Sequence, residues 1–373
     1  MKIGIPKEIL FNESRVAGTP DILSKLTKKG FDIQVESGAG ALAGFTDQNY
    51  EAIDHISICN TETVFQSDII FKVHPPTEDE ILKMKKGSVL ISFLEPHQNT
   101  NLLTKLAECG VNALSIELLP RTSRAQSMDV LSSQANIAGY RGVIEACAQY
   151  KRYFPMMMTS AGSAKPAKVI VLGAGVAGLQ AIATAKRLGA SVEAYDIRPE
   201  VKEEIESLGA KFIDIQLEEE GSGEGGYAKE LSEEAKKKQQ ELLSQKLMKA
   251  DVIITTANIP GRKAPVLVPE DVLDQMREGS VIVDLAAATG GNCPLTEKDQ
   301  VVVKKGVTLV GYTNYPAMLP SDASNFISRN YMNLLGLLTK KENDNVSMEF
   351  NLEDDIIDAT LVTHQNEVRF QKK

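Results

Sequence analysis

The stretch VIVLGAGVAGLQ, residues 169–180, decides the fold of this chain. Its first four residues are apolar and favour a strand, a glycine-spaced turn follows, and residues 181–188 are typical of a helix. Gly173, Gly175 and Gly178 form the pattern G-x-G-x-x-G, which permits a tight turn, a close approach of backbone to a pyrophosphate, and close helix–strand packing. The free amides at the start of the helix would bind the phosphates.

The spacing beyond this turn favours a dinucleotide site. A second strand is expected at residues 191–195, and it ends in Asp196, about 20 residues after the glycines, where the fingerprint has an acidic residue. The alternative is a glycine-rich turn that binds no ligand. We interpret the stretch as the first βα unit of a nucleotide-binding domain.

Length and composition limit the class of protein. A chain of 373 residues suits two domains, and 43% hydrophobic with 24% charged residues is typical of a soluble globular protein. No apolar run approaches the roughly 18 residues that cross a bilayer. The start, MKIGIPKEIL, lacks the apolar core of a signal peptide, so we expect the chain to be cytoplasmic.

Charge, cysteine and histidine content exclude further classes. The net charge of -9 argues against binding of nucleic acid, which depends on basic surface. No C-x-x-C pair and no metal-ligand spacing is visible, so we expect neither a metal nor a redox site. The scattered residues are Cys59, Cys109, Cys147 and Cys293, and His55, His74, His97 and His364.

Apolar runs alternate with helical stretches in two blocks, which predicts α/β domains with mostly parallel sheets covered on both faces. The first block has expected strands at 2–5, 31–35, 68–73, 89–94 and 112–115, and helices at 21–29 and 101–107. The second block continues with expected strands at 211–215, 251–256, 281–285 and 308–310.

These blocks predict two Rossmann-like domains with the nucleotide in the cleft between them. A helix at 326–338, entered through SDAS, is expected to return the chain to the first domain. The N-terminal domain would then be discontinuous, comprising 1–131 and 321–373, and residues 132–320 would form the nucleotide-binding domain. The acidic tail after residue 342 shows little pattern.

The segment 117–155 is expected to join the domains. Its first half, PRTSRAQSMD, is polar, and its second half has helical apolar spacing at Ile137, Tyr140, Ile144 and Ala148 before Pro155. We expect the helix to link the domains and the polar loop to lie at the mouth of the cleft.

Three further features allow two interpretations each. Arg15 precedes a helix and either pairs with an anionic ligand or lies on a solvated loop. His74 follows a strand, where α/β sites gather, yet it is also an ordinary loop histidine by position. The glycine-rich segment EGSGEGGY, residues 220–227, is either a surface connection or a lid anchored by Tyr227.

With these residues in place, the sequence resembles the family that joins alanine dehydrogenase to the NAD(H)-binding component of proton-translocating transhydrogenase. The resemblance covers nearly the whole chain. It is carried by KEILFNESRVAGTP, RAQSMDVLSSQANIAGYR, GAGVAGLQAIATAKRLGA with YDIR, GGYAKE, TTANIPGRKAP and VDLAAATGGN. RAQSMDVLSSQ, GGYAKE and YDIR resemble the transhydrogenase branch specifically.

The chain departs from the dehydrogenase branch at its catalytic positions. The substrate lysine, the histidine and the aspartate of alanine dehydrogenases fall on His74, Glu95 and Ala288, whereas Arg15 matches the carboxylate-binding arginine. Oxidising an amino acid moves protons as well as a hydride and needs a positioned acid or base. The chain is therefore a poor candidate for that reaction.

The resemblance implies a set of NAD(H)-binding residues. Gln126, Asp129 and Ser132 would orient the nicotinamide without acid or base chemistry. Asn258 stands where the family often has an apolar residue, so its contact is the weakest inference. The implied cofactor contacts are Arg121, Thr122, Ser123, Arg124, Gln126, Gly173, Gly175, Val176, Gly178, Asp196, Ile197, Arg198, Gly226, Tyr227 and Asn258.

The resemblance also implies the reaction and the partners. Hydride would pass between NADH and NADP⁺ in a Re/Si-specific, proton-translocating transhydrogenase, where proximity and orientation of the two rings supply the catalysis. NADP(H) would be bound by a beta subunit, and separate membrane-spanning subunits would carry protons. The chain would be a homodimer, peripheral on the inner membrane. The rival functions are a soluble amino-acid dehydrogenase and a catalytically silent NAD sensor.

Overall fold

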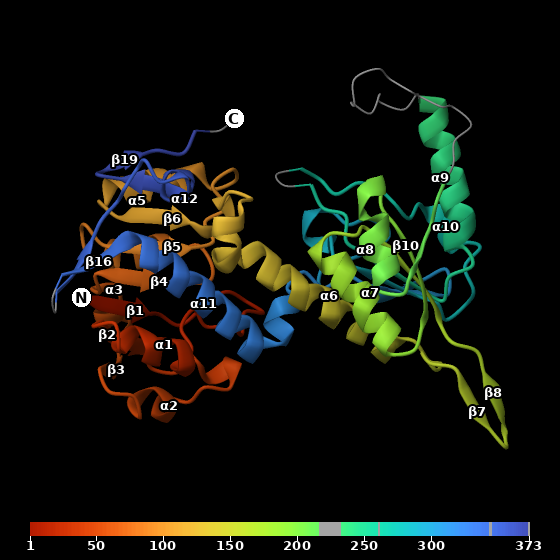
Figure 1. Cartoon of the computed structure of the whole chain (residues 1–373), viewed down its shortest axis with the longest axis horizontal. Helices are drawn as coiled ribbons and strands as arrows, with labels where there is room; N and C mark the ends of the chain where they lie inside the picture. The colour runs from red at the N-terminus through yellow and green to blue at the C-terminus, as the bar shows by residue number, and fades with distance from the viewer. Residues whose placement is uncertain (216–232, 260–261, 343–344, 372–373) are drawn as a thin grey trace. The chain divides into compact units, whose positions relative to one another are not determined.

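A computed structural model describes residues 1–215, 233–259, 262–342 and 345–371 (Figure 1). The chain divides into two compact units, Met1–Gln134 with Pro316–Lys373, and Ala135–Tyr315. The sequence placed these divisions after residues 131 and 320. Helix α6 (Val130–Gln149) runs through the first division and α11 (Pro320–Leu338) follows the second.

The first unit contains an eight-stranded sheet in the order β19-β18-β6-β5-β4-β1-β2-β3. Strands β1 to β6 are parallel, and β18 and β19 are antiparallel additions at one edge. The chain order reverses between β1 and β4, and the carboxyl ends of the strands at such a reversal are where open α/β sheets commonly bind ligands. The strands are β1 (Lys2–Ile5), β2 (Asp32–Glu36), β3 (Ile56–Cys59), β4 (Ile69–Phe71), β5 (Val89–Ser92), β6 (Asn112–Ser115), β18 (Leu361–His364) and β19 (Glu367–Val368).

Side chains alternate between the two faces of this sheet, and helices cover both. Ile69 and Phe71 of β4 pack in one cluster with α1 (Pro20–Thr27), α11 and α12 (Asp355–Thr360). Ile70 packs in a second cluster with the helices α3 (Thr61–Phe65), α4 (Glu78–Lys83) and α5 (Thr100–Glu108). The two-faced, mostly parallel sheet expected from the sequence is therefore confirmed.

The second unit contains a seven-stranded sheet in the order β11-β10-β9-β12-β13-β15-β14. All neighbours are parallel except β14 and β15. The order reverses between β9 and β12, as in dinucleotide-binding folds. The strands are β9 (Lys168–Leu172), β10 (Ser191–Tyr195), β11 (Lys211–Phe212), β12 (Val252–Thr255), β13 (Val281–Asp284), β14 (Val301–Lys304) and β15 (Val307–Val310), and the helices are α7 (Val176–Arg187), α8 (Lys202–Ser207), α9 (Glu233–Leu247) and α10 (Glu270–Leu273).

Smaller elements complete both units. The short helices are α2 (Asp47–Glu51), η1 (Ala41–Ala43), η2 (Ile116–Leu118), η3 (Ser123–Met128), η4 (Pro199–Val201), η5 (Ala287–Thr289) and η6 (Tyr315–Met318). Two hairpins form from β7 (Met157–Thr159) with β8 (Gly162–Ala164), and from β16 (Thr339–Glu342) with β17 (Asn345–Met348). Across the described ranges, no helix is long and apolar enough to cross a membrane.

The structure differs from the sequence-based expectation in two places. The acidic tail is ordered into α12, β18 and β19, because apolar residues such as Ile356 and Leu361 complete the core of the first unit. Helix α6 ends at Gln149, six residues before Pro155. Its buried positions include Gly139 and Val143, while the apolar Tyr140 is 40% exposed.

Candidate functional site

The glycine turn between β9 and α7 has the shape that a dinucleotide site needs. Gly173 has a φ of +97°, which disfavours any residue with a Cβ. A Cβ on Gly178 would lie 1.8 Å from the carbonyl oxygen of Gly173, so only glycine permits this packing. Apart from its two neighbours in the chain, none of the described residues has an atom within 4 Å of the Cβ position of Gly175, so the backbone here is open to a ligand.

Helix α7 begins next to this open backbone. Its N-cap is Gly175, which has no side chain to cap the first amides, and Val176 at its first position is 41% exposed. Uncapped amides and the positive end of the helix dipole suit a phosphate group. The turn therefore fits the pyrophosphate of a dinucleotide.

Asp196 lies at the end of β10 and is hydrogen-bonded to the turn. Its Oδ2 accepts a hydrogen bond from the amide of Ala174 at 2.7 Å, and its Oδ1 accepts from the amide and Nε of Arg198 at 2.9 and 3.0 Å. Burial alone would raise the pKa of Asp196, but the hydrogen bonds from Arg198 and these amides lower it below its ordinary value. Asp196 is therefore ionised at neutral pH, and it holds Arg198.

A buried carboxylate fixes the loops that follow β12 and β13, next to the glycine turn. Asp284, at the end of β13, is completely buried and accepts five hydrogen bonds of 2.8–3.1 Å. The amide of Asn292, next to this carboxylate in the folded loop, donates from Nδ2 to the carbonyls of Ala257 and Pro265. Asn258 is thereby placed beside Thr289, whose hydroxyl donates to its Oδ1 at 3.0 Å. The five donors to Asp284 are Thr255, Ala286, Asn292, Cys293 and Thr296.

Helix α6 packs tightly on the first turn of α7. A Cβ on Gly139 would lie 2.1 Å from the carbonyl oxygen of Ala177. Asn136 of α6 donates to Gln180 of α7 at 3.1 Å. Any substitution that enlarges Gly139 must move α6 away from the turn.

The polar segment that precedes α6 belongs to the first unit and forms η3. Ala125 and Met128 are buried, whereas Arg121, Gln126 and the residues between them other than Ala125 are exposed. The carboxylate of Asp129 accepts hydrogen bonds from the amide and the hydroxyl of Ser132 at 2.9 and 2.5 Å, and this contact caps the first turn of α6. The segment is thus anchored by its buried apolar residues, and its polar side chains are exposed.

Arg124 of this segment is paired with carboxylates from the C-terminal part of the chain. Its guanidinium pairs with Asp354, the N-cap of α12, at 2.6 and 2.8 Å, and also with Asp355. Both carboxylates come from the tail that showed little pattern in sequence. An anionic ligand would have to compete with them for this arginine.

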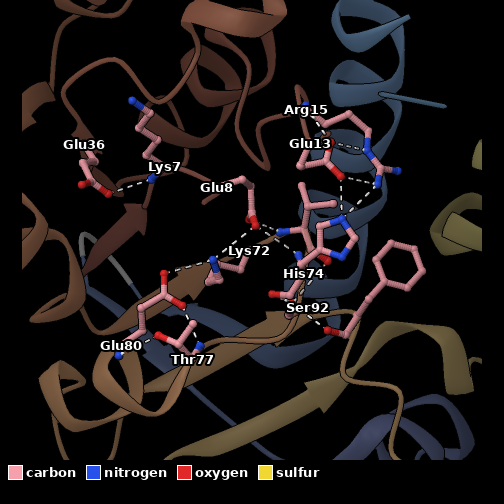
Figure 2. Close-up of polar contacts among 12 residues, drawn as sticks. Lys7, Glu8, Glu13, Arg15, Glu36, Lys72, His74, Thr77, Glu80 and Ser92 are labelled. Atoms are coloured by element: carbon pink, nitrogen blue, oxygen red, sulfur yellow. Dashed lines mark hydrogen bonds and ion pairs between the residues drawn. The ribbon is translucent and has the colours of Figure 1, made fainter. Parts of the chain in front are cut away.

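A second polar cluster lies in the first unit, at the carboxyl ends of β1 and β4 (Figure 2). Glu13 and Arg15 form a two-pronged ion pair with Nε–Oε1 and Nη2–Oε2 distances of 2.8 and 2.7 Å, and both side chains are buried. His74 binds the same Oε2 through Nε2 at 2.5 Å. The interpretation of Arg15 as a solvated loop residue is therefore wrong, because an internal carboxylate pairs with it in the core.

The charges of this cluster explain why Glu13 stays ionised. Burial would raise the pKa of Glu13, but hydrogen bonds and attraction from Arg15 and His74 hold it well below its usual range. Next to it, Lys72 is 1% exposed and lies 3.2 Å from carboxylate oxygens of both Glu8 and Glu80 (Figure 2). Each buried charge in the cluster thus has a partner of opposite sign.

Comparison with known proteins identifies the family. The model of the alanine dehydrogenase/PNT N-terminal domain matches residues 4–138, and that of the C-terminal domain matches residues 142–371. The chain belongs to the alanine dehydrogenase/PNT family. Within this family it is similar to the NAD(P) transhydrogenase subunit alpha of Haemophilus influenzae, with 47% identity over 98% of this chain and 71% of the relative.

Two further relatives match over nearly their full lengths. An NAD(P) transhydrogenase subunit alpha chain of Rhodospirillum rubrum is 46% identical over 99% of this chain and 97% of the relative. The crystal structure of transhydrogenase from Sinorhizobium meliloti has a TM-score of 0.86 and 40% identity, covering 99% of this chain and 98% of that one. The chain thus has the two-domain α/β fold of that transhydrogenase, a fold that an alanine dehydrogenase structure also matches, with a TM-score of 0.79.

The structure locates the implied site residues of this family member in separate groups. Gly173, Gly175, Val176 and Gly178 share the turn in the second unit with Asp196, Ile197 and Arg198, and with Asn258 on the neighbouring loop. Arg121 to Ser132 lie in the first unit. Gly226 and Tyr227, with the lid to which they were assigned, lie outside the described residues.

Sequence reasoning missed four side chains that organise these groups: Gln134, Asn330, Asp284 and Asn292. Asp284 carried a signal, because it is a charged residue that ends an otherwise apolar strand, VIVD. Gln134 and Asn330 lie within helices among other polar residues, and nothing in their spacing distinguishes them from surface positions.

Proposed function

We propose that this chain is the NAD(H)-binding component of a transhydrogenase and that hydride passes directly between NADH on this chain and NADP⁺ on a partner subunit. The observation that carries the proposal is its near full-length similarity to transhydrogenase alpha chains. The glycine turn, with open backbone at Gly175 and an acidic residue at Asp196, supports binding of a dinucleotide.

The chain's own residues would bind NAD(H) and orient its nicotinamide ring. The amides at the start of α7 hold the pyrophosphate, and Asp196 lies where it can meet the adenosine ribose. Gln126, Asp129 and Ser132 orient the nicotinamide, with Asp129 and Ser132 already fixed by their mutual hydrogen bonds. Ring placement is the main catalytic contribution, because a direct hydride transfer needs no acid or base on the protein.

The amino-acid dehydrogenase alternative is disfavoured by the first-unit cluster. Arg15 is bound to Glu13, and His74, at the position of the substrate lysine, is bound to the same carboxylate. Glu95 and Ala288 stand at the positions of the family's catalytic histidine and aspartate. A silent NAD sensor would not require the RAQSMD segment.

The proposal extends to assembly. Residues 132–320 form the NAD(H)-binding domain, and residues 1–131 with 321–373 form the other. The chain works as a homodimer and docks on an NADP-binding beta subunit. Membrane-spanning subunits of the same complex carry the protons, so the chain is peripheral on the cytoplasmic side of the inner membrane.

The dehydrogenase alternative is tested with the isolated chain. With NADH, pyruvate and ammonia, absorbance at the NADH band should stay constant, because no group is placed to move the protons of reductive amination. Robust pyruvate-dependent oxidation of NADH would assign the chain to the dehydrogenases instead. An alanine dehydrogenase assayed in parallel verifies that the conditions support the reaction.

A further inference from the structure

Arg15 occupies the position of a substrate-binding residue but is engaged entirely inside the first unit. Its side chain is 6% exposed, and the guanidinium edge formed by Nε and Nη2 faces Glu13 (Figure 2). A two-pronged contact is the geometry by which arginine binds a substrate carboxylate. Here the carboxylate of Glu13 takes that geometry, so a substrate is not what holds Arg15 in place.

The remaining guanidinium nitrogen of Arg15 points to a different role. Its Nη1 donates to Oε1 of Gln134 at 3.0 Å, on the second turn of α6. Gln134 is itself buried, and its Nε2 donates to the carbonyl of Ala323 on α11 at 3.2 Å and to Oγ of Ser133 at 3.3 Å. Arg15 thereby fixes the rotation of Gln134 and, through it, the register of α6 against α11.

From Ser133 the series of hydrogen bonds continues to the polar segment, residues 121–132. Oγ of Ser133 has two acceptors within reach, Oδ1 of Asn330 at 2.9 Å and the carbonyl of Val130 at 3.1 Å, of which Asn330 is the nearer. Nδ2 of Asn330 in turn donates to the carbonyl of Ser127 at 3.0 Å. Asn333 donates to the same carbonyl at 2.8 Å. Ser127 lies directly after Gln126 and two residues before Asp129, so this carbonyl is where the segment is tied to α11.

We propose that Arg15 is a positioning residue: it holds the 121–132 segment in place through Gln134, Ser133 and Asn330. The inference rests on the proposed function, because the segment carries the residues assigned to the nicotinamide. It also gives the buried Arg15 a role in a protein whose proposed reaction involves no amino-acid carboxylate for it to bind. The cluster of Glu13, Arg15 and His74 serves as a fixed support in the first unit.

The sharpest variant is Arg15→Lys. A lysine keeps a positive charge against Glu13, but its single ammonium group cannot reproduce the planar fork that reaches both Glu13 and Gln134. Ser133→Ala removes the hydrogen bonds in the middle of the same series and leaves no buried charge unpaired. It therefore still tests the inference if Arg15→Lys fails to fold. Ser328→Ala is the control, because it also removes a serine hydroxyl that is hydrogen-bonded beside α11, here to the amide of Thr19, and takes no part in the hydrogen bonds that lead from Arg15 to Ser127.

The first measurement needs neither ligand nor activity. Hydrogen exchange of the full-length chain, followed by mass spectrometry, should show faster exchange in peptides covering 121–132 for Arg15→Lys and Ser133→Ala, and unchanged exchange there for Ser328→Ala. The inference is overturned if the two variants exchange like the wild type in these peptides, or if the control accelerates them equally.

The second measurement uses the chain reconstituted with a transhydrogenase NADP-binding domain. Both variants should slow hydride transfer by about tenfold, because a small displacement of the reacting rings is costly, while the Kd for NADH changes less than about threefold. Melting temperatures that fall with unchanged transfer rates would reduce Arg15 to a stability role and overturn the inference. Absence of transfer in the wild type would instead overturn the proposed function, and hydrogen exchange would still decide whether Arg15 holds the segment.

Discussion

At the scale of single residues, we expect Asp196 to determine which nicotinamide nucleotide the second unit accepts. Its carboxylate is ionised and already holds Arg198, the nearby cation that could otherwise accompany a 2′-phosphate. A ribose hydroxyl can still donate to this carboxylate, whereas a phosphate would face it as a like charge.

Calorimetry should therefore find that NADH binds about 100-fold more tightly than NADPH, since an uncompensated like-charge contact costs several kcal/mol in an interface. Asp196→Asn should narrow this preference, because the amide removes the negative charge but keeps a group that can bond to Ala174. Equal affinity of the wild type for the two nucleotides would contradict the assignment.

Glu13 gives a residue-scale prediction about pH. Its pKa is lowered on folding, so its ion pair stabilises the fold fully above the unfolded carboxyl pKa of about 4.3, and this stabilisation is lost as pH falls through and below that value. At pH 7, Glu13→Gln should lower the free energy of unfolding by about 3 kcal/mol, because it leaves Arg15 buried without its counter-charge.

The difference in the free energy of unfolding between the wild type and Glu13→Gln should become smaller when urea unfolding is repeated from pH 6 down to pH 3.5. The reason is that, over this interval, Glu13 takes up a proton in the unfolded wild-type chain but stays ionised in the fold, whereas the variant has no such group. A difference that stays constant with pH would show that folding does not lower the pKa of Glu13, and the charge pairing inferred for the first-unit cluster would be wrong.

At the scale of elements, the close contact of α6 with α7 depends on one glycine. Gly139→Ala would place a Cβ 2.1 Å from the carbonyl oxygen of Ala177, so α6 must shift, and we expect a loss of about 1–3 kcal/mol in the free energy of unfolding. Gly336→Ala on α11 is the control, because Gly336 is exposed and, apart from its chain neighbours and the adjacent backbone of α11, none of the described residues comes within 4 Å of its Cβ position.

The control should gain up to about 1 kcal/mol, since alanine is the better helix former in an open position. Both values come from urea titrations under one set of conditions. Stabilisation by Gly139→Ala as well would mean that α6 does not pack against α7 at this distance.

Elements also show what the sequence could and could not reveal. The parallel strands were predictable because continuous apolar runs such as VIVL and VIIT are buried on both faces of a sheet. The glycine turn was predictable because each of its glycines meets a separate steric demand. The tail after residue 342 was not, because β18 and α12 are ordered by contacts with β6 and the first-unit core that lie far away in the sequence.

The polar networks were unpredictable for a related reason. The distance between Arg15 and Gln134 in the chain exceeds one hundred residues, and Glu13 looks like one more acidic residue in a polar loop. Only the fold shows that these side chains lie together in the interior, where each buried charge must have a partner. Arg124 was similarly assigned to the cofactor, without sight of its pairing with Asp354.

At the scale of the whole molecule, both units are parallel sheets whose strand order reverses once, and both place their polar groups beyond that reversal. In the second unit these groups leave backbone open for a dinucleotide. In the first unit they are paired with one another. We therefore propose that the pyrophosphate and adenosine ribose bind to the second unit, and that the first-unit cluster supports the 121–132 segment proposed to orient the nicotinamide.

The central claim, direct hydride transfer to a nucleotide on a partner, is tested most directly by following the transferred hydrogen. The chain is mixed with a transhydrogenase NADP-binding domain, NADP⁺ and NADH that carries deuterium at both C4 positions, in ordinary water, and the NADPH formed is analysed by mass spectrometry. We predict that every NADPH molecule carries one deuterium, because no protein group exchanges protons with the transferred hydrogen. NADPH without deuterium, or no NADPH with a partner domain known to be competent, would contradict the claim.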